Sequence, residues 1–227
     1  MSTEYPKINT LFERQPDFSI DPTKFKHPVY DTIKLWDVTE KIDGTNIRVI
    51  FNPGRPATGP EVDCWNQQPG IEPHVRFLGR TDAAILPGGL LQNLAKLFPV
   101  EKLAAKFQSP VVLYGEGYGA GIQKIEGGPY RPDKSFILFD VKIGDWWMNT
   151  QEVQDLAKSL EIDAVPYRGQ LTMDEIINLC RAGFRSYLNL DCVAEGIVAR
   201  PVETLFDSRH ERVILKLKTK DFKPGKR

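Results

Sequence analysis

The stretch from Leu35 to Phe51 reads LWDVTEKIDGTNIRVIF, and apolar and β-branched residues lie on both sides of its central Asp43-Gly44. Such short runs are typical of β-strands. Asp-Gly between two of them is a strong hairpin signal, because both residues tolerate the backbone of a tight turn. The stretch therefore predicts two strands joined by a hairpin turn at Asp43-Gly44.

Outward from this stretch, the hydrophobic pattern predicts further strands and three helical regions. Strands are expected near residues 75–79, 111–115, 135–143, 193–200 and 212–219. Helices are expected over 90–107 with a break at Pro99, after an N-cap at Thr150, and after a capping box that begins at Thr172. Residues 1–30 and 52–72 are rich in Pro, Gly or polar residues and are expected to be irregular. This irregular order favours an α+β fold with largely antiparallel sheets.

Composition places the chain among ordinary globular proteins. It has 227 residues, of which 41% are hydrophobic and 26% charged, enough for one large domain or two small ones. Its apolar runs are too short to cross a membrane, and the first residues lack the pattern of a secretory signal. Thirty basic residues balance thirty acidic ones, which argues against coating of nucleic acid by bulk charge but leaves a local basic groove open.

The three cysteines indicate the compartment rather than the chemistry. Cys64, Cys180 and Cys192 are an odd number and contain no Cys-x-x-Cys pair. That pattern fits a reducing compartment and argues against a zinc module. We expect partly buried thiols and a cytoplasmic protein.

Several charged residues stand at the ends of predicted strands or inside them. A lysine before a tight turn, such as Lys41, is by itself most often solvated, and Lys-x-Asp-Gly alone is common. Glu195 lies in an apolar run, where a lone carboxylate needs a cation or a metal as partner. Strand alternation puts Lys216 and Lys218 on one face. The informative feature is the order of these residues along the chain.

Taken in that order, the motifs resemble those of the covalent nucleotidyltransferase superfamily of ligases and RNA capping enzymes. Within it the chain looks most like the phage RNA ligase 2 family. The resemblance covers nearly the whole chain, and the motifs that carry it are Glu40-Lys41-x-x-Gly44-Thr45-Asn46, Arg80-Thr81, Gly115-Glu116, Gly121-Ile122-Gln123-Lys124, Phe139-Asp140, Glu195-Gly196-x-Val198, and Lys216-x-Lys218 with Phe222.

The resemblance implies a nucleotidyltransferase (ATP-grasp-like) domain of two antiparallel sheets flanked by helices, with the nucleotide in the groove between them. Residues 1–227 would form this single domain, with a basic tail at about 219–227 and no separate C-terminal domain. The segment from Arg212 to Arg227 has seven basic residues and one acidic residue. It is expected either to grip the nucleic acid or to be a solubilising, disordered end.

The resemblance also implies the catalytic roles. Lys41 would attack the α-phosphate of ATP and hold AMP as a phosphoramidate, which requires a neutral amine. Lys216, Lys218 and a divalent cation would discourage protonation of that amine and neutralise phosphate charge. Glu195 would bind Mg²⁺ or Mn²⁺ through carboxylate oxygen.

The other site residues are expected to bind the nucleotide or to support the site. Glu116 would bond the ribose, and Phe139 would stack on adenine with Phe136 as the fallback. Arg80 would contact the AMP ribose or the 5′-phosphate of the nucleic acid, and Asn46 the adenylate phosphate or the RNA end. The expected nucleotide-binding set is Glu40, Ile42, Asn46, Arg80, Glu116, Phe139, Lys216 and Lys218. The expected supporting set is Asp43, Gly44, Asp140 and Arg200. Within it, Asp140 would hold strand geometry or the metal region.

Two positions depart from the pattern of the family. Arg200 stands where lysine is usual, so a planar fork replaces a point charge and the role of the residue is open. Asp43 stands where the phage enzyme has histidine, although aspartate is common across the superfamily.

The implied reaction has three steps: adenylylation of Lys41, transfer of AMP to an RNA 5′-phosphate, and attack by a 3′-hydroxyl with release of AMP. The partner would be RNA with such ends, in a nicked duplex, in single strands or in cleaved tRNA, bound by a monomer without membrane contact in the cytoplasm of a bacterial or phage-infected cell. Alternatives within the same chemistry are a DNA nick ligase and a GTP-using capping enzyme. An alternative of another class is a non-catalytic nucleic-acid-binding module with the same fold.

Overall fold

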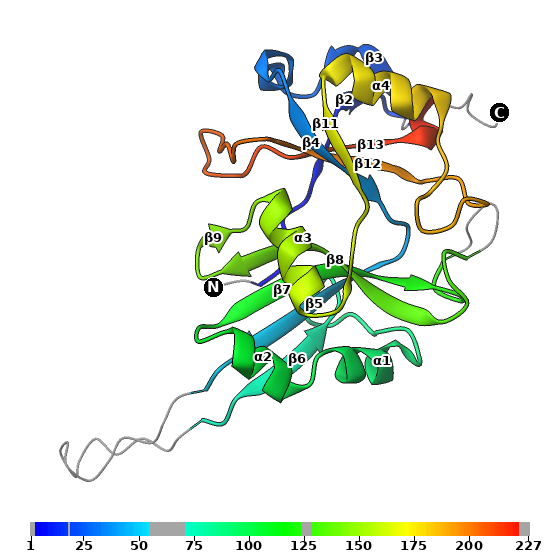
Figure 1. The fold of residues 1–227 in the computed structure, drawn as a ribbon. Helices are drawn as coiled ribbons and strands as arrows, with labels where there is room; N and C mark the ends of the chain where they lie inside the picture. Colours follow the sequence, from blue (N-terminus) through cyan, green and yellow to red (C-terminus); the bar gives the residue numbers. More distant parts are fainter. Residues whose placement is uncertain (1–2, 18, 55–70, 124–128, 223–227) are drawn as a thin grey trace. The chain divides into compact units, whose positions relative to one another are not determined.

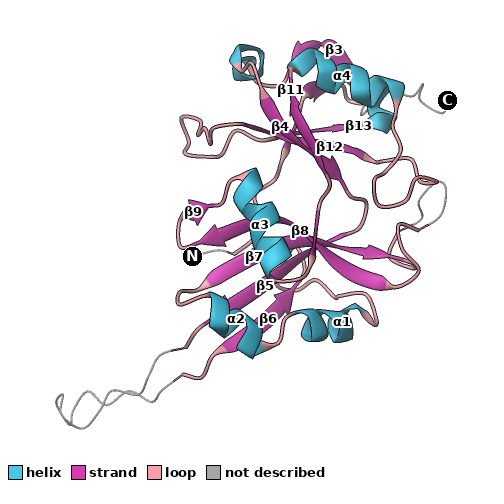
Figure 2. Ribbon diagram, in the orientation of Figure 1, coloured by secondary structure: helices cyan, strands magenta, loops and turns pink. Residues whose placement is uncertain are grey.

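The computed structural model describes residues 3–17, 19–54, 71–123 and 129–222. The chain forms two compact units, whose strands and helices are drawn in Figures 1 and 2. The first unit comprises Met1–Tyr5, Thr45–Gly117 and Lys134–Ala164, and the second comprises Pro6–Gly44, Tyr118–Asp133 and Val165–Arg227. The fold is thus a mixed α+β arrangement, as expected, but the described residues form three sheets rather than two, and two of these sheets contain a parallel pair.

A six-stranded sheet forms the centre of the first unit. Its strand order is β10 (Asp163–Ala164), β8 (Lys134–Ile143), β7 (Val111–Gly119), β5 (Thr45–Asn52) and β6 (His74–Leu78), with β9 (Trp146–Trp147) paired to β8. The strand β5 pairs antiparallel with β6 and β7, whereas β10 runs parallel to β8. Alternate residues of β5, namely Ile47, Val49 and Phe51, are fully buried and form part of the core.

The described part of the first unit contains the helices α1 (Leu90–Leu97), α2 (Val100–Lys106) and α3 (Thr150–Ser159). The predicted break at Pro99 is confirmed, since this residue is the N-cap of α2. The expected N-cap at Thr150 is wrong by one residue. Asn149 is the N-cap, because its side chain accepts the Glu152 amide while Glu152 accepts the Asn149 amide.

A five-stranded sheet forms the centre of the second unit. Its strand order is β1 (Asn9–Thr10), β13 (Leu215–Lys218), β12 (Gly196–Pro201), β4 (Trp36–Lys41) and β11 (Tyr167–Leu171). The pairs are antiparallel except that of β1 with β13, which is parallel. The unit also contains β2 (Phe12–Arg14), which pairs with β3 (Ile20–Phe25), and the helices η1 (Pro28–Thr32), α4 (Met173–Ala182) and η2 (Thr219–Phe222).

The core of the second unit lies between one face of this sheet and the helix α4. Ile176 and Cys180 of α4 pack with side chains of β4, β12 and β13 in a single buried cluster. The capping box at Thr172 is confirmed, with Glu175 as its reciprocal partner. The opposite face of the same strands is therefore available for polar side chains.

The predicted hairpin at Asp43-Gly44 is wrong, although both of its strands exist. The strand β4 pairs with β11 and β12, and β5 pairs with β6 and β7, so the two strands belong to different sheets (Figure 1). Neither Asp43 nor Gly44 has the positive φ that a type I′ turn requires at both central residues. The segment is a crossover from one sheet to the next.

The irregular segments contain more structure than expected. The prediction of an irregular N-terminus is wrong for β1, β2 and β3, which the sequence pattern does not reveal because their residues are largely polar. The strands β10 and β11 were not expected either. Residues 219–222 of the expected basic tail form η2, whereas 223–227 lie outside the described residues, as does most of the expected loop at 52–72.

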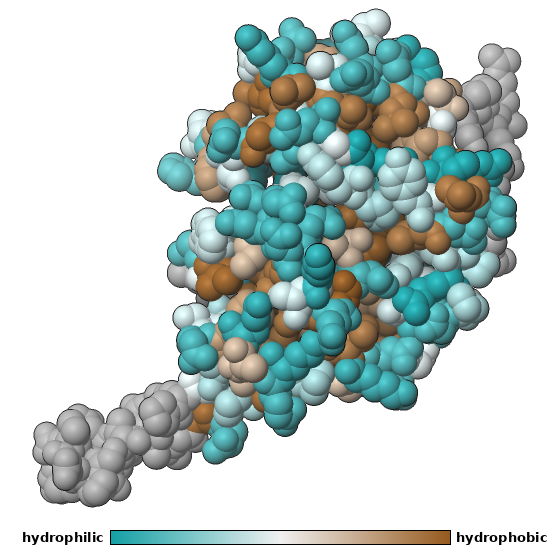
Figure 3. Space-filling model, viewed as in Figure 1, coloured by the Kyte–Doolittle hydropathy of each residue, from teal (hydrophilic) through white to brown (hydrophobic). Residues whose placement is uncertain are grey.

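The described surface and thiols agree with the sequence expectations. Hydrophilic residues surround smaller hydrophobic patches on the face drawn in Figure 3, as is usual for a protein surface. No helix among the described residues is long and apolar enough to span a bilayer. Cys180 and Cys192 are buried free thiols, whereas Cys64 lies outside the described residues.

Candidate active site

Three neighbouring strands of the second unit bring the predicted catalytic residues together. In the registers of β4, β12 and β13, Gly196 lies opposite Lys41 on one side and opposite Lys218 on the other. Glu195 directly precedes Gly196 and therefore lies between the two lysines. Lys41 lies 154 residues before Glu195 and 177 residues before Lys218 in the sequence. Strand pairing therefore brings these residues together.

Glu195 is an ion-pair partner of both lysines. Lys41 Nζ donates to Glu195 Oε2 at 2.6 Å, and Lys218 Nζ lies 2.5 Å from Glu195 Oε1. The side chains of the lysines are 23% and 22% exposed, and that of Glu195 is 11% exposed. The carboxylate holds the two lysine side chains next to each other, and it is the lysines that could neutralise the charge of a phosphate.

The same face of the sheet carries further cations. Strand alternation puts Lys216 on the face of Lys218, away from the buried Leu215 and Leu217. Val198 lies between Thr39 and Lys216 in register, and Arg200 lies opposite Asp37 on the same face. The expected pairing of Lys216 and Lys218 on one face is confirmed.

Gly196 permits the close approach of β12 to β13. Its φ is +155°, and a Cβ at this position would lie 2.1 Å from the Leu217 carbonyl oxygen and 2.7 Å from the Lys218 Cα. Backbone atoms cannot yield to such an overlap as a flexible side-chain end can. Glycine is therefore required at position 196, where β12 and β13 come close enough for Glu195 to contact Lys218.

Replacing Gly196 by alanine is expected to lower the free energy of unfolding by about 1–3 kcal/mol, as overpacking usually does. It should also reduce lysyl-AMP formation, because the strands that carry Glu195 and Lys218 must separate. Thermal melts and labelling with ATP check both effects. Gly88→Ala is the matched control, since nothing lies within 4 Å of a Cβ there; an equal loss in the control would contradict the argument.

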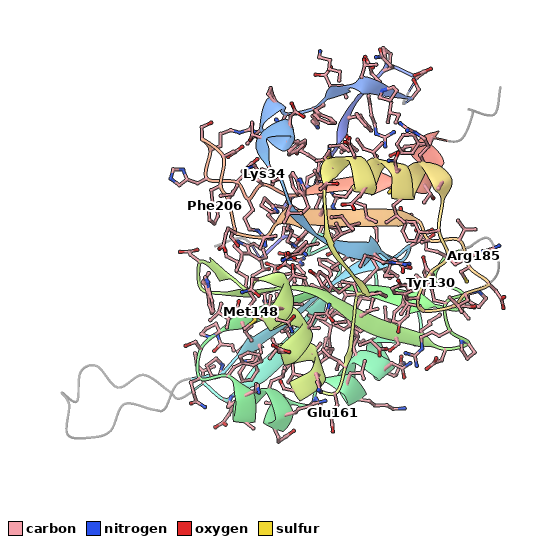
Figure 4. The ribbon with its side chains drawn as sticks, turned by 45° about the horizontal axis from the view of Figure 1, so that its top comes forward. Lys34, Tyr130, Met148, Glu161, Arg185 and Phe206 are labelled. Carbon is pink, nitrogen blue, oxygen red and sulfur yellow. The ribbon has the colours of Figure 1, made fainter. Side chains whose placement is uncertain are left out.

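Glu40 is buried on the core side of β4, next to the predicted nucleophile. It is 1% exposed, and its Oε2 accepts hydrogen bonds from Arg168 Nη2 and from the Tyr187 amide, each at 3.1 Å. The Arg168 guanidinium carbon lies 3.4 Å from the Tyr187 ring centroid and 4.5 Å from that of Phe184. Arg168 also donates to the carbonyl of Arg185, which is labelled in Figure 4.

Through this network the buried Glu40 carboxylate ties β4 to Arg168 and Tyr187. Because its carboxylate is enclosed, a nucleotide contact through that group stays a prediction. Ile42 is 3% exposed and is likewise enclosed.

Asp43 and Tyr130 lie at the start of the crossover after Lys41. The Asp43 amide donates to the Tyr130 hydroxyl, labelled in Figure 4, at 3.3 Å. Partial burial raises the pKa of the Asp43 carboxyl, and the negative charge of Glu195 raises it further, whereas Lys41 lowers it. Burial also raises the pKa of the Tyr130 hydroxyl, which therefore stays protonated at neutral pH.

The raised pKa of Asp43 predicts a pH-dependent stability effect. The folded state binds the Asp43 proton more tightly than the unfolded state does. Ionisation of this group therefore destabilises the fold as the pH rises above 3.8, the ordinary pKa of the carboxyl. Asp43→Asn should therefore raise the melting temperature at pH 7, and the gain should shrink towards pH 4. Thermal melts at both pH values test this, with the exposed Asp31→Asn as control; a gain that grows on acidification would contradict it.

Three of the predicted nucleotide-binding residues, Asn46, Glu116 and Phe139, lie on the six-stranded sheet of the first unit. Asn46 of β5 lies directly opposite Glu116 of β7, so the two side chains share a face of the sheet. Both are half-buried. The buried Oδ1 of Asn46 has no hydrogen-bond partner among the described residues.

Phe139 and Asp140 of β8 are held by an N-terminal aromatic residue. The Tyr5 ring lies edge-on to Phe139, with the centroids 5.1 Å apart, and its hydroxyl donates to Asp140 Oδ2 at 2.6 Å. Phe139 is half-buried, which leaves part of its ring available for stacking. The fallback stacker Phe136 is wrong, because it is fully buried and packs edge-on against Phe98.

The remaining predicted residues are placed more simply. Arg80 is exposed in the turn that follows β6. Gln123 Nε2 donates to the carbonyl of Gly44, at the crossover, at 3.0 Å. Lys124, the last residue of that motif, lies outside the described residues. The site residues thus form two sets, one in each unit.

Glu195 is the residue that fits the predicted divalent metal. No group of three or more His, Cys, Asp and Glu side chains that could hold a metal occurs in the described part of the chain. Mg²⁺ commonly binds through one or two carboxylates, substrate phosphates and water, so a single carboxylate is a suitable protein ligand. Both Glu195 oxygens contact lysines in this structure, so a metal and the lysines would share the carboxylate.

Several residues of the site were not singled out from the sequence. Arg168 and Tyr187 lie more than 120 residues from Glu40 and carry no local motif. Tyr5 lies in a segment expected to be irregular, and Tyr130 lies where no strand or helix was expected. Arg48 gave one usable signal, since it is a charged residue between the apolar Ile47 and Val49 in a predicted strand.

Comparison with known proteins identifies the family of the chain and structures with a similar fold. The sequence profile of the RNA ligase family matches residues 34–218, and no curated protein sequence matches the chain. Structures of the Naegleria gruberi RNA ligase are similar: a variant with ATP and Mn has 18% identity and a TM-score of 0.59, covering 94% of this chain and 61% of that one. The same ligase with pyrophosphate has 19% identity, a TM-score of 0.59, and 94% and 61% coverage.

A further variant of that ligase, with AMP and Mn, has 18% identity and a TM-score of 0.59 over the same 94% and 61%. This chain therefore spans about three fifths of the length of these structures, and at this identity the likeness shows the fold. The family match covers most of the chain, including every strand that carries the predicted catalytic residues. The chain belongs to the RNA ligase family.

Proposed function

We propose that the chain is an ATP-dependent RNA ligase of the phage RNA ligase 2-like branch. It would join an RNA 3′-hydroxyl to a 5′-phosphate through a lysyl-AMP and an adenylylated RNA. The observation that carries the proposal is the pair of lysines, Lys41 and Lys218, held by one carboxylate at the end of three paired strands. Belonging to the RNA ligase family gives this arrangement its chemical context.

In the first step, Lys41 Nζ would form a bond to the α-phosphorus of ATP as the bond to pyrophosphate breaks. The amine must first give up a proton, and Glu195 Oε2 is the acceptor in contact with it. Lys218 and Lys216 would neutralise the phosphate oxygens of the nucleotide. A divalent metal at Glu195 would supply further positive charge.

The second and third steps are also displacements at phosphorus and need the same charge neutralisation. The RNA 5′-phosphate would attack the lysyl-AMP and release the Lys41 amine. The 3′-hydroxyl would then attack the adenylylated end and release AMP. Asn46, Glu116, Phe139 and Arg80 would bind the nucleotide or the RNA end.

The solved relatives support this sequence of steps. Their bound molecules are ATP, AMP with Mn, and pyrophosphate, which are the substrate, the transferred group and the first product of such a reaction. A groove between the sheets, a monomeric state and RNA binding by the basic tail remain predictions.

Labelling and sealing assays test the proposal. Purified protein with radiolabelled ATP and Mg²⁺ or Mn²⁺ should become labelled, and it should seal RNA with 5′-phosphate and 3′-hydroxyl ends. A panel of nicked duplexes, single strands and cleaved tRNA identifies the substrate. GTP and DNA nicks are the comparison arms for a capping enzyme or a DNA ligase. Well-folded protein that binds RNA but takes no label from either nucleotide would indicate a non-catalytic module.

A further inference from the structure

Arg48 is a buried charge on the polar face of the first unit. It lies on β5, two residues after Asn46, and its side chain is only 1% exposed. Burying a guanidinium is costly unless its donors are satisfied. Its neighbours Ile47 and Val49 supply the core on the other face, so a hydrophobic residue here would be the simpler choice for stability alone.

The Arg48 guanidinium has three acceptors in two segments of the chain, Thr3 near the N-terminus and the turn from Gly79 to Asp82. Its Nε donates to the Gly79 carbonyl at 2.7 Å, its Nη2 to Asp82 Oδ1 at 2.7 Å, and its Nη1 to Thr3 Oγ1 at 2.8 Å. The rigid, planar fork can hold three acceptors in a fixed geometry, which a lysine cannot. Two of the three acceptors, Gly79 and Asp82, flank Arg80-Thr81.

The turn that Arg48 holds is tight. The Ala84 amide donates to the Thr81 carbonyl at 3.2 Å, and a Cβ at Gly79 would lie 2.7 Å from the Ala84 Cβ. Gly79 is buried, whereas Arg80 and Asp82 are exposed. The exposed Arg80 thus lies between two residues that the buried arginine contacts, Gly79 through its carbonyl and Asp82 through its carboxylate.

We propose that Arg48 is a positioning residue that holds the Gly79–Asp82 turn so that Arg80 recognises the 5′-phosphate of the RNA. The inference rests on the proposed function and adds a residue to it. Arginine binds phosphate through paired hydrogen bonds, and the strength of such a contact depends on its geometry. Fixing the backbone beforehand reduces the entropy lost when the phosphate binds.

The experiment compares binding of a labelled RNA with a 5′-phosphate and the same RNA with a 5′-hydroxyl, measured by fluorescence anisotropy. The wild-type chain should prefer the 5′-phosphate by about 10-fold, and Arg80→Ala should remove that preference. Arg48→Gln should also reduce it towards unity. The double variant should match Arg80→Ala alone, because Arg48 acts through Arg80.

Arg76→Gln, at an exposed position of β6, is the matched control and should keep the preference. If Arg48→Gln does not fold, Asp82→Ala tests the same tether, because the Asp82 side chain is 74% exposed and its removal leaves the core intact. Unchanged preference in the folded Arg48→Gln or Asp82→Ala protein overturns the proposal, as does a wild-type chain without preference. The proposal is also overturned if Arg48→Gln weakens binding of the 5′-phosphate RNA by the same factor in the Arg80→Ala protein as in the wild-type chain.

The binding assay requires no turnover, so the two proposals fail separately. A wild-type chain that prefers the 5′-phosphate through Arg48 but takes no label from ATP contradicts the ligase function alone. A chain that seals RNA but keeps its phosphate preference after Arg48→Gln contradicts the role of Arg48 alone.

Discussion

Lys41→Ala is expected to abolish lysyl-AMP formation, with a loss of at least about 10⁴-fold, because no other group can replace a covalent nucleophile. The fold should persist. The Lys41 side chain is partly exposed and makes one ion pair, and Glu195 keeps Lys218 when it is removed. The change in the free energy of unfolding should therefore stay within about 1 kcal/mol.

Transfer of label from radiolabelled ATP, with a thermal melt on the same sample, measures both effects. The exposed Lys34→Ala, at a position labelled in Figure 4, is the control and should label normally. Sealing of RNA that already carries a 5′-adenylate bypasses the first step, so Lys41→Ala should keep much of that activity. Label on the Lys41→Ala protein would mean that another residue is the nucleophile.

Glu195→Gln is expected to reduce lysyl-AMP formation by about 10²–10³-fold, the usual loss when one charge-stabilising group is removed. The substitution keeps the shape of the side chain but removes the negative charge that both lysines contact. It also removes the carboxylate oxygen that would bind the metal. The half-saturating concentration of Mg²⁺ or Mn²⁺ should therefore rise together with the loss of rate.

Labelling across a metal titration separates these contributions. The exposed Glu203→Gln is the control, and neither its rate nor its metal dependence should change. A Glu195→Gln protein with a reduced rate at every metal concentration, but an unchanged half-saturating concentration, would contradict the metal role and leave the lysine contacts as its function. Unimpaired labelling would contradict both.

The short-range features of the fold were readable in the sequence because they depend on neighbouring residues. The capping box at Thr172 and the helix break at Pro99 are local hydrogen-bond and backbone effects, and both are confirmed. The alternation of Lys216 and Lys218 with two leucines correctly assigned the faces of β13. The ordered motifs likewise indicated the RNA ligase family.

Strand pairing was decided by the tertiary structure, because a strand's partner depends on which sheet can bury its apolar face. Asp43-Gly44 had the local chemistry of a hairpin, yet β4 and β5 pair in separate sheets, where Val38 of β4 and Val49 of β5 are fully buried. The same pairing brings Glu195 between Lys41 and Lys218. The motif order identified these three residues, and long-range register brought their charges within contact distance.

Roles that depend on burial were decided in the same way. Phe136 and Phe139 are chemically identical and three residues apart, and only the packing of β8 puts the first in the core. The position of Arg48 between two apolar strand residues marks it as unusual, but its three acceptors, in two distant segments of the chain, are set by the tertiary structure. Residue types and their order follow from local chemistry, whereas contacts between distant segments follow from how the whole chain buries its apolar surface.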